Sequence, residues 1–272
     1  MTTGLGSAIV SDGIWLKQEG RLSVNRVYVV LLLSLVLLLG VVLSACEGTA
    51  QRTAEWYLDQ GNELAEQGSY DEAIEEYTSA IELDPDYAEA YNNRGNAYFY
   101  LGEYQDAIAD FISAIELDPD YAEAYYNLGY AHYSLGEYQE AIGNFTSAIE
   151  LDPNDAEVYF NRGNAYFHLG ELQEAIADFT TLIELDPNDA EVYYNRGVSY
   201  YYLGEHQDAI ADFTSAIELD PDYAKAYYNR GVAYKVQGEK AEAIADFEEA
   251  INLTVDPLLI EMATEQIEEL EE

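Results

Sequence analysis

Four arginines in this sequence are each followed, sixteen residues later, by an aspartate. A guanidinium group presents its N–H donors in a fixed fork that fits a carboxylate, so this spacing favours an ion pair between two neighbouring segments. The pairs are Arg94 with Asp110, Arg162 with Asp178, Arg196 with Asp212, and Arg230 with Asp246. Where Leu128 stands in place of the arginine, the aspartate sixteen residues later is also replaced, by Asn144. We predict a structural salt bridge; the alternative is an arginine row for an anionic ligand, whose charge the aspartates would neutralise.

Asparagine recurs every 34 residues, at Asn93, Asn127, Asn161, Asn195 and Asn229, and we call these five residues the asparagine column. An amide offers one acceptor and two donors, which match the hydrogen-bonding groups of a peptide unit. The column is therefore a candidate for binding the backbone of a partner. The alternative is that these amides only solvate or cap the surface.

The residues that could carry catalysis or hold a metal are scattered. His132, His168 and His206 occupy three different places in the repeat, so they form no ligand set. No serine or cysteine has an obvious base partner, and the glycines have helix-ending or helix-packing explanations. We expect no enzyme activity, no metal and no cofactor.

The elements that position these columns come from a repeat. Five of the six prolines are 34 residues apart, and a fixed period of this size indicates stacked supersecondary units. In one unit, apolar periodicity predicts helices over 88–101 and 104–117, separated by Gly102 and ended by Asp118-Pro119. Six units follow one another: 54–87, 88–121, 122–155, 156–189, 190–223 and 224–257.

The helix starts carry their own signals. Asp120 with Glu123 three residues later has the spacing of a capping box, and the same spacing recurs in other units. Asp256-Pro257 can cap and begin a last helix, so residues 258–272 are expected to cover the sixth unit.

These residues resemble the tetratricopeptide repeat. The family's signature places are occupied by Tyr91, Gly95, Tyr98, Ala107, Phe111, Ala114 and Pro119, and the six units cover about three quarters of the chain. The resemblance implies an all-α fold: a right-handed helix-turn-helix solenoid of six repeats with a C-terminal capping helix.

In this family the first helices line a concave face, so the resemblance places the asparagine column there. Aromatic residues that stand beside it are favoured interface anchors. We therefore expect a peptide-binding groove that also includes Tyr126, Phe160, Tyr194, Tyr228, Phe99, Tyr133, Phe167 and Tyr201. Where other members carry a basic clamp for a C-terminal carboxylate, this chain has mostly glutamates, which argues against that ligand.

The formal net charge is -42. Such a surface repels nucleic acid and favours basic partners, although much of the charge serves solubility. We expect the ligand to be another protein that offers a basic and apolar segment.

The N-terminal residues predict a membrane attachment. Residues 27–45 are almost wholly apolar and precede Cys46, the only cysteine. The order of a weakly basic region, an apolar run and small residues fits a secretory signal over 1–45. Leu43-Ser44-Ala45-Cys46 resembles a bacterial lipobox, which implies lipidation of Cys46 and a location in the bacterial envelope, facing outside the cytoplasm. The alternative is an uncleaved helix over 27–45; in both cases 46–53 is a short tether.

Three functions remain open at this stage. The first is a membrane-anchored protein that holds a partner's segment in its groove. The second is an assembly factor for an envelope machine, in the manner of pilotin lipoproteins, and the third is a structural spacer.

Overall fold

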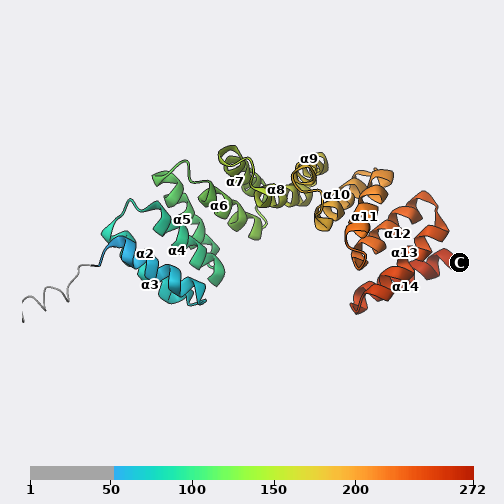
Figure 1. Cartoon of the computed structure of the whole chain (residues 1–272), viewed down its shortest axis with the longest axis horizontal. Coiled ribbons are helices and arrows are strands. Elements are labelled where there is room, and N and C mark those ends of the chain that lie inside the picture. The colour runs from blue at the N-terminus through green and yellow to red at the C-terminus, as the bar shows by residue number, and fades with distance from the viewer. Residues whose placement is uncertain (1–51) are drawn as a thin grey trace, which may run out of the picture. The chain divides into compact units, whose positions relative to one another are not determined.

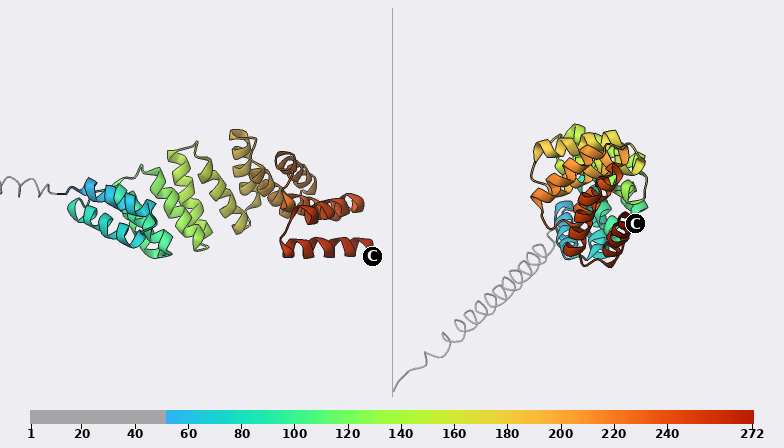
Figure 2. Two further views of the ribbon diagram at one scale, coloured as in Figure 1. Left: turned by 60° about the horizontal axis from the view of Figure 1, so that its bottom comes forward. Right: turned by 90° about the vertical axis from the view of Figure 1, so that its right-hand side faces the viewer.

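The computed structural model describes residues 52–272, and residues 54–272 form one compact unit. The apolar run, Cys46 and most of the tether lie outside the described residues. Within the unit, every element is a helix, and the helices pair into six successive hairpins (Figure 1). The first helices of the hairpins are α2 (Ala54–Glu66), α4 (Ala88–Leu101), α6 (Ala122–Ser134), α8 (Ala156–Leu169), α10 (Ala190–Leu203) and α12 (Ala224–Gln237). The second helices are α3 (Tyr70–Leu83), α5 (Tyr104–Leu117), α7 (Tyr138–Leu151), α9 (Leu172–Leu185), α11 (His206–Leu219) and α13 (Lys240–Leu253). The final helix, α14 (Pro257–Glu271), packs on α13 (Figure 2).

Each helix packs mainly against its neighbours in the chain, as in a solenoid. The first helices of successive repeats also contact one another, for example α4 with α6 and α6 with α8. In Figure 1, α6, α8 and α10 lie along the inner side of the row of hairpins, and α7 and α9 lie along its outer side. The first helices therefore present one continuous inner surface.

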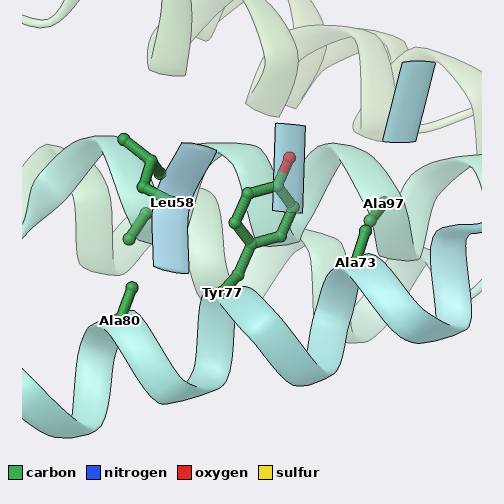
Figure 3. Packing of buried hydrophobic residues seen from close by; sticks show 6 residues of the cluster. Leu58, Ala73, Tyr77, Ala80 and Ala97 are labelled. Atoms are coloured by element: carbon green, nitrogen blue, oxygen red, sulfur yellow. The ribbon is translucent and has the colours of Figure 1, made fainter. Parts of the chain in front are cut away.

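A small residue and an aromatic residue bring the two helices of each hairpin together. A Cβ added to Gly95 of α4 would lie 2.7 Å from the Phe111 ring of α5, so only glycine permits this close approach. Ala107 and Phe111 are fully buried. In the first hairpin a tyrosine takes the phenylalanine's place, and Figure 3 shows Tyr77 among Leu58, Ala73 and Ala97. The predicted helices 88–101 and 104–117 are thus confirmed.

The helix starts differ from the sequence prediction. Asp120 does not cap α6, because the N-cap residue is Tyr121, whose side chain makes no capping bond. Asp118 instead accepts a hydrogen bond from the Asp120 backbone N–H at 3.1 Å, which stabilises the turn before the helix. Capping by a side chain does occur one residue later, in α8 by Asp155 and in α10 by Asp189. Asp256 caps α14 as predicted, although the helix begins at Pro257 and not at residue 258.

Candidate functional site

All thirteen residues predicted to bind a peptide lie on first helices, and all thirteen are half-buried. The five asparagines are distributed one to a repeat over α4 to α12, at the same position of each repeat, so they form a row along the first helices. A half-buried position leaves part of each side chain accessible while neighbours fix its orientation. The prediction that this row touches a partner stays a prediction.

Hydrogen bonds join four of the five asparagines to the preceding first helix. Asn93 donates to Asn62 Oδ1 at 3.0 Å, and Asn127 donates to Asn92 Oδ1 at 2.9 Å. In later repeats a tyrosine hydroxyl accepts this bond, from Asn161 to Tyr126 at 3.2 Å and from Asn229 to Tyr194 at 2.8 Å. These four amides therefore brace adjacent repeats, and each of them keeps only part of its hydrogen-bonding capacity for a ligand.

Four of the predicted aromatic residues form a layer over the buried phenylalanines of the second helices. Their ring centroids lie 5.6–6.2 Å from those phenylalanines, a separation at which aromatic rings attract one another. The pairs are Tyr126 with Phe145, Phe160 with Phe179, Tyr194 with Phe213, and Tyr228 with Phe247. These half-buried rings therefore pack first helices onto second helices within their repeats.

Three recesses lie on the first helices of the N-terminal repeats. The first, of about 460 Å³, is lined by residues that include Asn62 and Asn93. The second, of about 320 Å³, has the predicted residues Phe99, Tyr126 and Asn127 in its wall. The third, of about 420 Å³, shares Tyr126, Asn127 and Glu157 with the second and adds three carboxylates, from Glu123, Asp152 and Asp155. The structure thus brings four predicted residues to recesses: Asn93, Phe99, Tyr126 and Asn127.

Sequence reasoning missed two of the most accessible aromatic residues. Tyr100 and Tyr130 line the second recess, and 66% and 37% of their surface is exposed. The predicted site consists of residues that recur in most repeats, whereas these two stand at places where the repeats differ. The signal in the sequence that could have indicated Tyr100 and Tyr130 is that the repeats carry different residues at these two places.

The arginine–aspartate pairs are confirmed as structural. Arg94 donates from Nε and NH2 to the two carboxylate oxygens of Asp110 at 2.7 and 2.8 Å. Its NH1 donates to the Thr78 hydroxyl of the preceding repeat at 3.0 Å, and the other three arginines repeat both contacts. The hydrogen bonds to Asp110 raise the pKa of Arg94 further above neutrality. Because three helices share each guanidinium, these arginines join repeats and do not form a row for an anionic ligand.

The three histidines contact different neighbours. His132 Nδ1 lies 2.7 Å from Glu137 Oε2, His168 stacks on Tyr138 at 5.0 Å, and His206 contacts the Tyr201 ring at 5.2 Å. Across residues 52–272, no three His, Cys, Asp or Glu side chains come together in a way that could hold a metal ion.

Comparison with known proteins agrees with this geometry. A family model described as TPR repeat matches residues 61–102, 95–136, 129–170 and 163–204, and a model described as tetratricopeptide repeat matches 190–223 and 224–253. These matches extend over more than half of the chain. The chain belongs to the tetratricopeptide repeat family. No match was found among curated proteins.

Solved tetratricopeptide repeat structures share the fold. YrrB, described as a TPR protein with an unusual peptide-binding site, is 28% identical with a TM-score of 0.62, over 70% of this chain and 97% of YrrB. MamA is 30% identical with a TM-score of 0.57, over 58% of this chain and 93% of MamA. MamA from Desulfovibrio magneticus RS-1 is 24% identical with a TM-score of 0.59, over 62% of this chain and 96% of its own, and shows the fold alone.

Proposed function

We propose that this tetratricopeptide repeat protein is a membrane-attached binding module that holds an extended or helical segment of another protein against its first helices. The observation that carries the proposal is the continuous row of half-buried asparagine and aromatic side chains on that surface. Polar amides beside aromatic rings can bind a peptide backbone and anchor its side chains. The description of YrrB as a peptide-binding protein supports the same use of the fold.

The charge of the chain limits which kinds of partner it can bind. With a net charge of -42, the protein attracts basic segments at long range and repels nucleic acid. Electrostatic attraction of this kind raises the rate of association and makes it sensitive to salt. The partner therefore offers a segment with basic and apolar side chains.

Site-directed photocrosslinking tests the binding surface. A benzoylphenylalanine at Asn195, which lies on the inner surface of α10, should crosslink a discrete partner in intact cells, and Asn127→Ala with Asn161→Ala should weaken the product. The matched control is the same probe at Glu184, which is exposed on the second helix α9. Equal crosslinking from both places, or a product that persists in the double variant, would contradict the proposal and favour a spacer.

Membrane attachment is the second half of the proposal, and it rests on the sequence of residues 27–46. Along residues 52–272, no helix combines the length and the apolar character needed to cross a bilayer. Metabolic labelling with radioactive palmitate should mark the wild-type chain and spare Cys46→Ala. Equal membrane recovery of the unlabelled Cys46→Ala variant would indicate an uncleaved helix over 27–45 as the anchor.

A further inference from the structure

The recess between α4 and α6 has aromatic walls. Phe99, Tyr100, Tyr126 and Tyr130 line it, and Phe111 lies at its base. Ring centroids are 5.4 Å apart for Phe99 and Tyr130, 6.0 Å for Phe99 and Tyr100, and 6.1 Å for Tyr126 and Tyr130. The four rings therefore contact one another and form an aromatic wall along a space of about 320 Å³, large enough for one long side chain.

Two of these rings are not needed by the repeat. At the place of Tyr130, the other repeats from the second to the sixth have Asn96, Asn164, Val198 and Val232. At the place of Tyr100, they have Ser134, His168, Tyr202 and Val236. Residues of different size and polarity occupy both places, so the repeat does not require a tyrosine at either; Tyr100 also stacks on Tyr70 at 4.9 Å and still leaves most of its surface exposed. Their exposure leaves them available to a ligand.

The electrostatics of this aromatic recess favour a cation. The faces of aromatic rings carry negative potential, and Glu157 of α8 adds a carboxylate at the wall. Glu157 Oε1 accepts a hydrogen bond from the Tyr126 hydroxyl at 2.7 Å, which fixes the carboxylate beside the rings. Burial, and after it the hydrogen bond to Glu157, raise the pKa of Tyr126, so the phenol stays neutral at physiological pH. Within the described part of the chain, no lysine or arginine lines the recess to oppose a positive charge.

We propose that the aromatic recess binds a single arginine side chain of the partner's segment, with its guanidinium plane against the rings and its N–H groups toward Glu157. A planar, weakly hydrated guanidinium stacks on aromatic faces and donates forked hydrogen bonds, whereas an ammonium is a compact and strongly hydrated charge. The adjoining recess, with Glu123, Asp152 and Asp155, extends the acidic path for further basic residues of the same segment. This inference rests on the proposed function and specifies one residue of its ligand.

The test uses the full-length chain labelled with ¹⁵N-tyrosine and titrated with N-acetyl-arginine methylamide. The signals of Tyr100 and Tyr130 should shift saturably, and the citrulline analogue, which has the same shape and no charge, should bind about fivefold or more weakly. Lysine and leucine methylamides are tested in parallel. Arginine and citrulline binding equally well would overturn the proposal, as would leucine binding most tightly or no saturable shift in the millimolar range.

Variants assign the effect to the aromatic recess. Tyr130→Asn and Tyr100→Ser each introduce a residue that another repeat carries at that place, so the fold should survive, and each should weaken arginine binding about fivefold. Glu157→Gln should reduce the preference for arginine over citrulline. Tyr202→Ser is the matched control, because Tyr202 is equally exposed at the corresponding place of the fifth repeat. An equal loss in Tyr202→Ser would overturn the proposal.

The two proposals can fail separately. If the inner surface crosslinks a partner at Asn195 and arginine is not preferred over citrulline, only the arginine assignment falls. If arginine binds and the crosslink is absent, the recess keeps its preference for arginine, whereas the proposed function falls, and with it the assignment of that arginine to a partner's segment.

Discussion

At the scale of single residues, the arginine shared by three helices is replaced as a set. In the third repeat Leu128 takes its place, Ile112 replaces the threonine and Asn144 replaces the aspartate. Leu128 is buried, and Asn144 bonds to the backbone oxygen of Glu140 in its own helix at 2.9 Å. The chain thus contains two self-consistent solutions for the same junction, one ionic and one apolar.

The fifth repeat offers a direct comparison of these solutions. Arg196→Leu leaves the buried Asp212 carboxylate without its partner and should lower the free energy of unfolding by about 3–5 kcal/mol. The triple variant Thr180→Ile, Arg196→Leu, Asp212→Asn reproduces the third repeat and should recover most of that loss. Urea denaturation measures both; a triple variant as unstable as Arg196→Leu would show that the replacement is not self-consistent.

Tyr77 links stability to alkaline pH. Burial, followed by Glu66 and Glu89, raises the pKa of Tyr77 from 10.0 to about 12. Because the folded state holds this proton more tightly than the unfolded state, its contribution is complete below pH 10 and is lost as the pH rises through about 12. A gap of this size corresponds to about 2–3 kcal/mol.

Phenylalanine occupies this place in the other five repeats, so Tyr77→Phe should fold. The substitution removes the 2.8 Å hydrogen bond that the Tyr77 hydroxyl donates to Asn62 Oδ1. This loss should lower the free energy of unfolding by about 1 kcal/mol near neutral pH. Between about pH 9 and pH 12 it should lose less stability than the wild type, as urea midpoints would show. Parallel pH profiles for the two proteins would refute the role of this phenol.

At the scale of elements, glycine has two different tasks. Gly102 ends α4 with φ of 81°, and a Cβ there would meet nothing within 4 Å. Gly102→Ala should therefore cost about 1 kcal/mol, from backbone strain alone. Gly95→Ala keeps a helical backbone but forces a Cβ to 2.7 Å from the Phe111 ring, and should cost about 1–3 kcal/mol.

Thermal denaturation of the two variants tests this distinction. Adding Phe111→Leu should reduce the cost of Gly95→Ala and leave that of Gly102→Ala unchanged, because only the former depends on the ring. If Phe111→Leu restored stability equally to Gly95→Ala and Gly102→Ala, the close approach of the Phe111 ring would not be the constraint at Gly95.

The helices were predictable because each one satisfies its pattern within the 34-residue unit. Ala107, Phe111 and Ala114 are buried as their spacing indicates. Helix capping was mispredicted at Asp120 because the N-cap position falls one residue later, where this repeat has Tyr121 and two other repeats have the capping residues Asp155 and Asp189. The bonds of the asparagine row join different repeats, for example Asn127 with Asn92, so no single unit reveals them.

At the scale of the whole molecule, excess negative charge acts on the fold and on the partner in opposite directions. The chain has 53 acidic and 11 basic residues, so repulsion between repeats lowers the stability of the free protein. Raising NaCl from about 10 to 200 mM shortens the screening length from about 30 Å to under 10 Å and should raise the melting temperature. The same change should weaken binding of a basic segment, since screening also reduces that attraction.

The shape of the salt dependence identifies its cause. Screening of repulsion should raise the melting temperature mostly below about 200 mM NaCl, where the screening length changes most, and little above it. Strengthened apolar burial would instead continue to rise with concentration, more steeply in sulfate than in chloride at equal ionic strength. Calorimetric melting curves in both salts separate the two. A melting temperature that is flat at low salt would mean that the acidic residues are spaced widely enough around the solenoid to avoid one another, and the charge would then bear on the partner alone.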